Sequence, residues 1–190
     1  MLIATDLLKA ALYCASTEET RYYLRGVHLN TSGHMVTTDG HRLFCAKLAE
    51  APATDVIIPL ADVQAALKLA GARCQEIEVT ADKIGQIQFT PVDGTFPEWR
   101  RVIPTGEETP SDKPDDNAAR AHFNHAYIGD LAKMGKALAG ASMLHPTSAS
   151  NPCLVTFGER EDCLAVLMPM RRNTSPDPLH GANVKRRVID

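Results

Sequence analysis

Several features that mark membrane, secreted and metal-binding proteins are missing from this 190-residue sequence. No apolar run is long enough to span a membrane, so we expect no transmembrane segment. The N-terminal segment contains Asp6 and no basic residues ahead of its apolar stretch, unlike a signal peptide. The five cysteines are odd in number, widely spaced and without a CxxC pair, which argues against a disulfide framework or a zinc site. We therefore expect a cytoplasmic protein with reduced, buried cysteines.

Catalytic motifs are missing as well. The sequence has no HExxH, GxSxG, Walker or GxGxxG motif. His122 and His125 flank the expected start of a helix at Asn124, so they would not share a helical face that could bind a metal. The neighbouring carboxylates Asp115 and Asp116 lie in a polar segment that offers nothing to hold them in a reactive geometry. We expect no enzymatic activity, no metal and no cofactor.

The charge balance excludes a uniformly basic coat for nucleic acid. Lys and Arg number 20 and Asp and Glu 23, which gives a net charge of −3. The distribution of charge over the surface matters more than this sum, so a local basic face remains compatible with it. The chain length fits one large domain, or one domain and part of a second.

Three segments of the chain begin alike, with a short extended stretch followed by an amphipathic helix. The stretches are residues 2–5, 56–59 and 121–124, and the helices are expected to follow each of them directly. Thr5 and Asn124 are expected to cap their helices, and Pro59 suits a first-turn position. Apolar residues at helical spacing predict the buried faces of the second and third helices: Leu60, Val63, Leu67 and Ala70, and Ile128, Leu131, Gly135 and Leu138.

Strand patterns follow each helix. The expected strands are residues 21–30, 34–39 and 42–49 after the first helix, 76–82 and 84–91 after the second, and 152–158 and 163–170 after the third. Residues 141–151 are expected to form a loop. The chain thus consists of three helix-plus-strand units, which should stack on one another because each has an apolar face to bury.

Residues 105–119 interrupt this pattern. They are acidic, contain proline and glycine, and have no large apolar side chain, which is typical of a linker. We expect a first domain of two units at residues 1–104, the linker at 105–119, one further unit at 120–172 and a flexible tail at 173–190.

Three motifs carry more specific information. The first combines residues 20–26 (TRYYLRG) with 37–43 (TTDGHRL), the second is residues 93–104 (DGTFPEWRRVIP), and the third is residues 166–171 (VLMPMR). Together, in this order, they resemble the bacterial sliding clamp, the beta subunit of DNA polymerase III. The alternative is that they are turn and strand-end sequences of an unrelated α+β fold.

The resemblance implies an α+β sliding-clamp (DNA clamp) fold of repeated helix-plus-antiparallel-strand units, amounting to about one and a half clamp domains. Residues 1–104 resemble the complete middle domain of that clamp, and residues 120–171 the second half of its last domain. Trp99 stands where the family usually has tyrosine.

Clamps of this family are rings that hold a polymerase on duplex DNA without reading its sequence. Their helices line the hole and need positive charge near the phosphates. The resemblance therefore implies that the helices face DNA, where the sequence offers Lys9, Lys68, Arg73, Lys133 and Lys136. For each of these residues, an ordinary solvated helix face is the alternative.

The family also docks short peptides of polymerases and clamp loaders in a hydrophobic groove. Leu, Val, Met and Pro would form its apolar wall, and arginines would meet the polar atoms of the peptide. The matching positions are Arg21, Leu24, Thr38, Gly40, His41, Arg42, Leu43, Pro97, Arg101, Val102, Asn124, Tyr127, Val166, Leu167, Met168, Pro169, Met170 and Arg171.

The number of units suggests an assembly. A family ring has six domains and therefore twelve units, so three units per chain predict a homotetrameric ring around double-stranded DNA, with polymerase and clamp-loader peptides as further partners. The alternative is a decoy or adaptor that binds clamp-binding peptides without encircling DNA.

Overall fold

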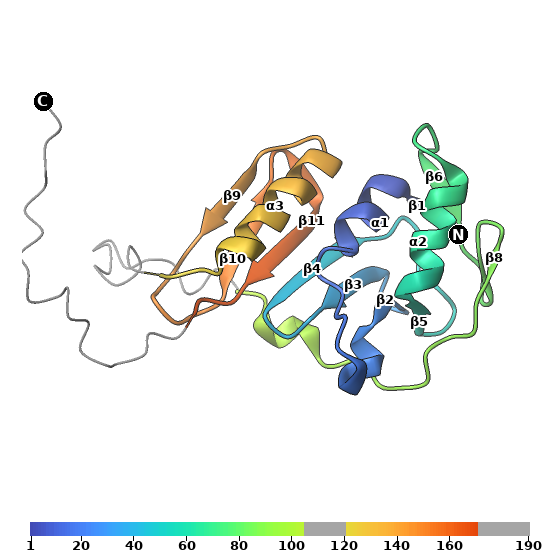
Figure 1. The fold of residues 1–190 in the computed structure, drawn as a ribbon, viewed down its shortest axis with the longest axis horizontal. Helices are drawn as coiled ribbons and strands as arrows, with labels where there is room; N and C mark the ends of the chain where they lie inside the picture. Colours follow the sequence, from blue (N-terminus) through green and yellow to red (C-terminus); the bar gives the residue numbers. More distant parts are fainter. Residues whose placement is uncertain (105–120, 171–190) are drawn as a thin grey trace, which may run out of the picture.

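The computed structural model describes residues 1–104 and 121–170. The expected linker at 105–119, the expected tail at 173–190 and the predicted groove residue Arg171 lie outside the described residues. The described chain combines helices with antiparallel sheets (Figure 1), as the α+β prediction requires.

A seven-stranded antiparallel sheet forms the centre of the molecule. Its order is β5-β2-β3-β4-β11-β10-β9, and two small two-stranded sheets pair β1 with β6 and β7 with β8. The strands are β1 (Leu2–Ala4), β2 (Gly26–Asn30), β3 (His34–Thr38), β4 (Arg42–Lys47), β5 (Val56–Pro59), β6 (Glu76–Glu78), β7 (Lys83–Ile84), β8 (Ile87–Gln88), β9 (Ser142–His145), β10 (Cys153–Phe157) and β11 (Arg160–Leu167).

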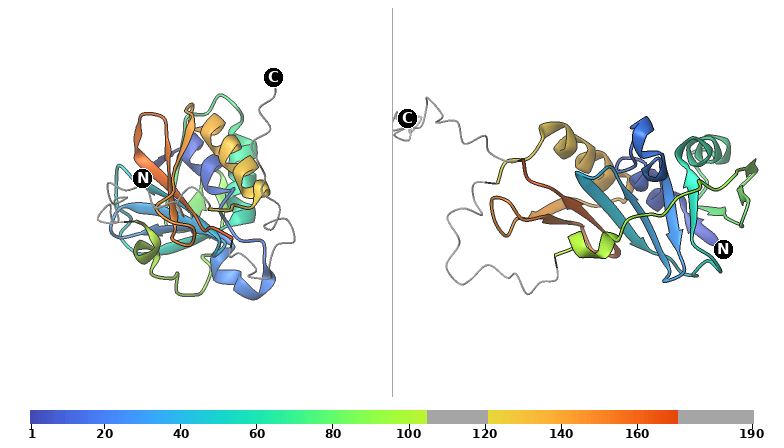
Figure 2. Two further views of the ribbon diagram at one scale, coloured as in Figure 1. Left: turned by 90° about the vertical axis from the view of Figure 1, so that its left-hand side faces the viewer. Right: turned by 90° about the horizontal axis from the view of Figure 1, so that it is seen from below.

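Three helices lie side by side on one face of the sheet (Figure 2), with α1 (Thr5–Ala11) between α2 (Leu60–Ala70) and α3 (His125–Ala137). The main core fills the space between helices and sheet. Phe44 and Phe157 meet there edge to face, with ring centroids 6.3 Å apart, and Met134 of α3 is fully buried. Since this core runs from unit to unit, the helices of all three units stack in one layer.

The opposite face of the sheet carries a second, smaller core. Side chains alternate along a strand, so Leu43 and Cys45 of β4 point away from the helices while Phe44 points towards them. Leu43 and Cys45 pack there with Val166 of β11 and with Trp99, which comes from the short 3₁₀ helix η2 (Trp99–Val102).

The three repeats appear as three structural units. Unit 1 runs from β1 to β4, unit 2 from β5 to β8, and unit 3 comprises residues 121–170 with α3 and β9 to β11. Strand β4 of unit 1 pairs with β11 of unit 3 from Arg42↔Leu167 to Cys163↔Ala46, so the main sheet continues from one unit into the other.

The two expected helix caps have different outcomes. Asn124 caps α3, because its side-chain oxygen accepts a hydrogen bond from the Ala126 N–H at 2.9 Å. The prediction for Thr5 was wrong: α1 begins at Thr5 itself, and the Thr5 hydroxyl donates instead to the Cys74 carbonyl at 2.7 Å. Pro59 directly precedes α2, at its N-cap position.

The strand expected over residues 21–30 begins only at Gly26, because Glu19–Leu24 form a 3₁₀ helix, η1. A Cβ on Gly26 would lie 2.5 Å from the Ile58 carbonyl oxygen, so this residue must be glycine for β2 to approach β5. The loop expected at residues 141–151 contains β9, and the strand expected at 84–91 is reduced to the two residues of β8 and the end of β7.

The buried face of α3 is rotated from the expected one. Ile128 is 37% exposed, whereas Met134 is fully buried. The helix packs against α1 as well as the sheet, and contact with α1 draws Met134 into the core.

Substitution of two glycines of α3 by alanine should change the free energy of unfolding in opposite directions. A Cβ at Gly135 would lie 2.7 Å from the Gly140 carbonyl oxygen, whereas a Cβ at Gly129 meets no atom within 4 Å. We expect Gly135→Ala to lower the free energy of unfolding by about 1–3 kcal/mol through overpacking. Gly129→Ala, the matched control, should raise it by about 0.5–1 kcal/mol through helix propensity. Urea denaturation measures both, and equal effects of the two variants would contradict the packing of α3.

Candidate functional site

A pocket of about 230 Å³ opens where units 1 and 3 meet, on the sheet face away from the helices. Its lining is mainly apolar and comes from three separate parts of the chain: the region from η1 to β4, the segment around η2, and the end of β11. The lining residues are Leu24, Thr38, Gly40, His41, Arg42, Leu43, Pro97, Glu98, Trp99, Val102, Val166 and Met168.

The turn between β3 and β4 forms one wall of this pocket, and its own side chains hold it in shape. One oxygen of Asp39 accepts from the N–H groups of His41 and Arg42, both at 2.9 Å. The Thr38 hydroxyl accepts from the Gly40 N–H and donates to the Arg42 carbonyl. Gly40 has a φ of +89°, and a Cβ there would lie 2.8 Å from an Arg21 nitrogen, so the turn needs glycine.

The segment around η2 forms the second wall. Trp99 is only 6% exposed and anchors the segment in the smaller core. The Arg100 guanidinium lies over the Trp99 ring, 4.3 Å from its centroid, and donates a hydrogen bond to the Ser32 hydroxyl. This fixes the backbone so that Pro97 and Val102 face the pocket.

The end of β11 forms the third wall. Met168 lines the pocket, and its N–H donates to the His41 carbonyl at 2.8 Å, so the chain beyond β11 stays beside the β3–β4 turn. Val166 points into the pocket, while its neighbour Leu167 points to the other face and is fully buried in the main core.

The structure thus brings most of the predicted groove residues together. Leu167 is the exception with a clear physical reason, because strand alternation turns it away from the pocket. Arg21 lies beside the turn, with Nη1 3.4 Å from the Asp39 carbonyl oxygen, and Arg101 is exposed on η2. Met170 is 54% exposed beyond the end of β11, next to Pro169. Asn124 caps α3, as described above.

Sequence reasoning missed Glu98 and Trp99 as pocket residues. Both lie within the recognised motif at residues 93–104, and Trp99 is the single tryptophan of the chain. The available signal was an aromatic side chain two residues after Pro97.

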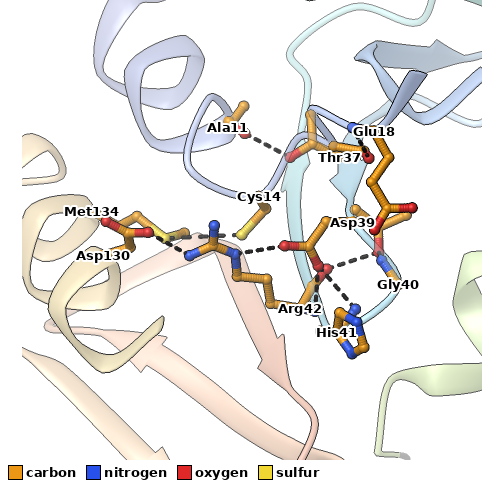
Figure 3. A network of polar contacts seen from close by, with 12 residues as sticks. Ala11, Cys14, Glu18, Thr37, Asp39, Gly40, His41, Arg42, Asp130 and Met134 are labelled. Carbon is orange, nitrogen blue, oxygen red and sulfur yellow. Dashed lines mark hydrogen bonds and ion pairs between the residues drawn. The ribbon is translucent and has the colours of Figure 1, made fainter. Parts of the chain in front are cut away.

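Arg42 is at the centre of a charge network that ties unit 1 to α3 (Figure 3). Its Nε lies 3.0 Å from Asp39, and its Nη1 lies 2.7 Å from Asp130 of α3. Its guanidinium also lies 4.4 Å from the ring centroid of Tyr127, and Lys133 contacts the second oxygen of Asp130 at 2.8 Å. Arg42 is therefore already engaged by two acids of its own chain.

The network shifts the pKa of Asp130. Burial by itself raises the pKa of this carboxyl group, but the hydrogen bonds from Lys133 and Arg42 outweigh it and hold the pKa below its ordinary value. Behind the network, burial raises the pKa of the Cys14 thiol, whose sulfur lies 4.0 Å from that of Met134. Cys14 is thus an unreactive core residue.

Of the five predicted DNA-facing residues, four have no ion pair recorded within residues 1–104 and 121–170. Lys9, Lys68 and Lys136 lie on α1, α2 and α3, and Arg73 follows α2. Lys133 differs, because Asp130 compensates its charge. On α1, Asp6 is similarly compensated by Arg160 at 2.7 Å.

Neither a membrane span nor a metal centre emerges from residues 1–104 and 121–170. Their helices are too short and too polar to cross a bilayer, and their His, Cys, Asp and Glu side chains form no group of three placed to hold a metal.

Comparison with curated proteins finds beta sliding clamps, although no protein-family model matches the chain. The beta sliding clamp of Caulobacter vibrioides is 34% identical over 120 residues, which cover 52% of this chain and 32% of that protein. That of Salmonella typhimurium is 28% identical over 160 residues, covering 77% of this chain and 44% of that protein. The chain therefore spans less than half the length of these relatives.

Comparison with solved structures finds the same fold. The DnaN sliding clamp of Bartonella birtlesii, solved with griselimycin, superposes with a TM-score of 0.64 at 24% identity and covers 90% of this chain and 66% of that one. The beta sliding clamp of C. crescentus gives 0.67 at 21% identity, covering 90% and 65%. The expected sliding-clamp fold and the resemblance to the beta subunit of DNA polymerase III are confirmed.

The lowered pKa of Asp130 predicts how stability depends on pH. A carboxyl group whose pKa is depressed by folding stabilises the folded state above its unfolded pKa of about 4, and this contribution is lost as the pH falls through the folded value. We expect Asp130→Asn to lower the free energy of unfolding by about 1–2 kcal/mol at pH 7, with the difference from wild type shrinking below about pH 4.

Urea denaturation between pH 3 and 8 measures this difference. Asp93→Asn is the matched control, because Asp93 is exposed and has no ion pair recorded in the described part of the chain. A deficit of Asp130→Asn that stays constant down to the lowest pH would show that the charge of Asp130 does not stabilise the fold.

Proposed function

Because the chain is related to bacterial beta sliding clamps in sequence and shares their fold, we propose that it is a DNA sliding clamp. In this proposal it has no enzymatic role, encircles duplex DNA in the cytoplasm as a ring of several copies, and docks replication proteins in the pocket between units 1 and 3. One observation carries the proposal: the three motifs of the resemblance, far apart in the sequence, converge on a single pocket.

The pocket suits a short peptide. It is apolar, with flexible Met168 on one side and rigid Pro97 and Trp99 on the other, so it can accept large apolar side chains. Arg21 and Arg101 are exposed beside it and are placed to meet polar or acidic atoms of the peptide. Arg42 lines the pocket, but its guanidinium is ion-paired with Asp39 and Asp130.

The layer of helices suits the DNA side of the ring. Lys9, Lys68 and Lys136 lie on these helices and Arg73 follows α2, and none of the four has an ion pair recorded within residues 1–104 and 121–170. The sheet would form the outside of the ring. With few such charges per chain, contacts to phosphate are weak and sensitive to salt, as sliding without sequence recognition requires.

The number of units sets the size of the ring. Residues 1–104 would act as a complete clamp domain and residues 121–170 as half of one. A twelve-unit ring would therefore take four copies of a three-unit chain, that is, a homotetramer.

The alternative role, a decoy or adaptor for clamp-binding peptides, also has a structural basis, because the pocket is complete within one chain. Only a closed ring is retained topologically on circular DNA, so a DNA experiment separates the two roles.

Retention on DNA tests the ring. Protein assembled in the presence of nicked circular plasmid should co-elute with the plasmid in gel filtration at high salt, and should be released when the plasmid is linearised. Lys68→Glu combined with Lys136→Glu should weaken binding to short duplexes and lower the slope of log K against log salt by about 0.9 for each phosphate that is no longer neutralised.

Lys47→Glu is the control for this experiment, because Lys47 is an exposed residue of β4 outside the helix layer. Lys133 is left unchanged because its reversal would disturb Asp130 and Arg42. Peptide binding without any retention on circular DNA would favour the decoy.

Peptide affinity tests the pocket. Val102 lines it and is 38% exposed, so a charge introduced there should be tolerated by the fold but should oppose an apolar ligand. We expect Val102→Glu to weaken binding of the clamp-docking peptide of a bacterial replicative polymerase at least about tenfold, or 1.4 kcal/mol, by fluorescence anisotropy. Leu69→Glu, at an exposed position of α2, should bind like wild type; equal affinities for all three proteins would exclude the pocket as the docking site.

A further inference from the structure

Units 1 and 2 complete each other by exchanging strands. The strand that precedes the helix in each unit pairs with the strand that follows the helix in the other. Thus β1 pairs antiparallel with β6, with Ile3 opposite Ile77, and β5 pairs antiparallel with β2, with Ile58 opposite Val27. All four of these side chains are buried in the main core.

Unit 3 has the same two edges, but the described residues contain nothing that pairs with them. Its strand after the helix is β9, whose strand partner within residues 1–104 and 121–170 is β10 alone. Its segment before the helix, residues 121–124, belongs to no strand pair in that part of the chain.

Residues 121–124 nevertheless occupy the position in unit 3 that β5 occupies in unit 2. In unit 2 the Val92 N–H, after β8, donates to the Ile57 carbonyl at 2.9 Å. In unit 3 the Met170 N–H, after β11, donates to the His122 carbonyl at 2.7 Å. Ile57 and His122 each lie three residues before the first residue of their helix, so the two contacts are equivalent. Since the other edge of β5 pairs with β2, the corresponding edge of residues 121–124 is placed to pair with a strand.

Strand β9 corresponds to β6 in the same way. Ile77 lies seven residues after the last residue of α2, and Leu144 lies seven residues after the last residue of α3. Like Ile77, Leu144 points to the main core, as does Phe123 in the segment before the helix. Both Leu144 and Phe123 are only partly buried, which leaves part of their apolar surface to be covered.

The open edge of β9 has none of the devices that protect an edge strand. Its four residues, Ser142–His145, include no proline, lysine or acidic residue, and Met143 is 62% exposed. On α3, Ile128 and Ala132 are exposed and lie about 40° apart at about 100° per residue, on the side opposite Asp130 and Met134, which contact unit 1. Small and apolar side chains on this flank suit close packing against another helix.

We propose that two copies of this chain associate through unit 3, with residues 121–124 of each copy pairing antiparallel with β9 of the other. By analogy with Ile3↔Ile77 and Ile58↔Val27, Phe123 lies opposite Leu144 of the partner subunit, and His122 lies opposite His145 of the partner subunit. A second copy is the occupant that fits, because each chain carries both the edge that is open and the segment that fills it. The contact is isologous and closes after two copies.

This pairing would form one of the contacts of the proposed ring. Its role in DNA binding therefore rests on the proposed function. The pairing makes one complete domain from the two half-domains of two copies. The second contact of a four-copy ring would then be made by unit 2. Two kinds of two-fold contact that alternate around four copies give dihedral symmetry. The pairing itself requires no DNA.

Cysteine cross-linking tests the register. Directly opposed residues of antiparallel strands have Cα atoms about 4.5–5.5 Å apart, within the range of a disulfide. His122 and His145 are both exposed, so the full-length variant that combines H122C and H145C should fold. Under mild oxidation it should form a covalent dimer in most molecules, as seen on non-reducing gels. The single variants H122C and H145C control for native Cys74, which is partly exposed, and should remain largely monomeric on the same gels.

A charge on the edge gives a second test that introduces no cysteine. Met143→Lys, at an exposed position, should reduce the solution mass measured by light scattering at least to half that of wild type, with an unchanged circular dichroism spectrum. Tyr22→Lys, at an exposed position of η1, should leave the mass unchanged.

The outcomes separate this inference from the proposed function. A tetrameric mass and retention on circular DNA, without dimer cross-links above those of the single variants, would overturn the unit 3 pairing and leave the ring standing. A cross-linked dimer with no retention on DNA would support the pairing and overturn the ring.

Discussion

The pairing of β4 with β11 is the contact on which the rest of this structure depends. It joins residues 42–46 to residues 163–167, which are far apart in the sequence, and makes one seven-stranded sheet from strands of all three units. Closing so long a loop costs conformational entropy, and the two faces of the joined sheet provide the compensation. On one face α1 and α3 pack together over the main core, and on the other Leu43 and Val166 share the smaller core with Trp99. The pocket lies directly over this junction, so its walls come together only when β4 and β11 are paired.

The charges at the junction follow from the same constraint. Arg42 is the first residue of β4, opposite Leu167 of β11, and its guanidinium is largely removed from water. A charge in such a place is tolerated only when it is paired, and Asp39 from the turn and Asp130 from α3 provide the partners. Asp130 in turn takes up the charge of Lys133. Arg42, which the sequence assigns to peptide binding, therefore also links unit 1 to unit 3. Lys133, which the sequence assigns to DNA binding, is ion-paired within the same network.

The sequence predicts most accurately those features that arise from local periodicity. The positions of α2, α3 and β10 agree with the expected ones, whereas β11 begins and ends three residues before the expected strand at 163–170. The groove motifs indicate which segments meet. Features that depend on long-range contacts were missed. Thr5 bonds to the carbonyl of Cys74, and Met134 is buried because α3 lies against α1; neither partner is near in sequence. Strand β9 is short and ends in polar residues, so its alternation is too brief to distinguish from a loop. For Leu167, the motif marked the right strand, but the side-chain alternation of β11 decides which residues face the pocket.

An odd number of units has a direct structural consequence. Units 1 and 2 satisfy each other because each supplies the strand that the other lacks, and no third unit can join that exchange. Among residues 1–104 and 121–170, unit 3 is supported on one flank, where β11 pairs with β4 and α3 packs on α1. Its second flank, with β9 and residues 121–124, repeats the edges that are paired in units 1 and 2. An unprotected strand edge beside partly covered apolar side chains is a template for strand pairing. Within residues 1–104 and 121–170, unit 3 has no partner for the geometry that pairs unit 1 with unit 2, and the proposed pairing of two copies supplies that partner from the repeat itself, without an added interface.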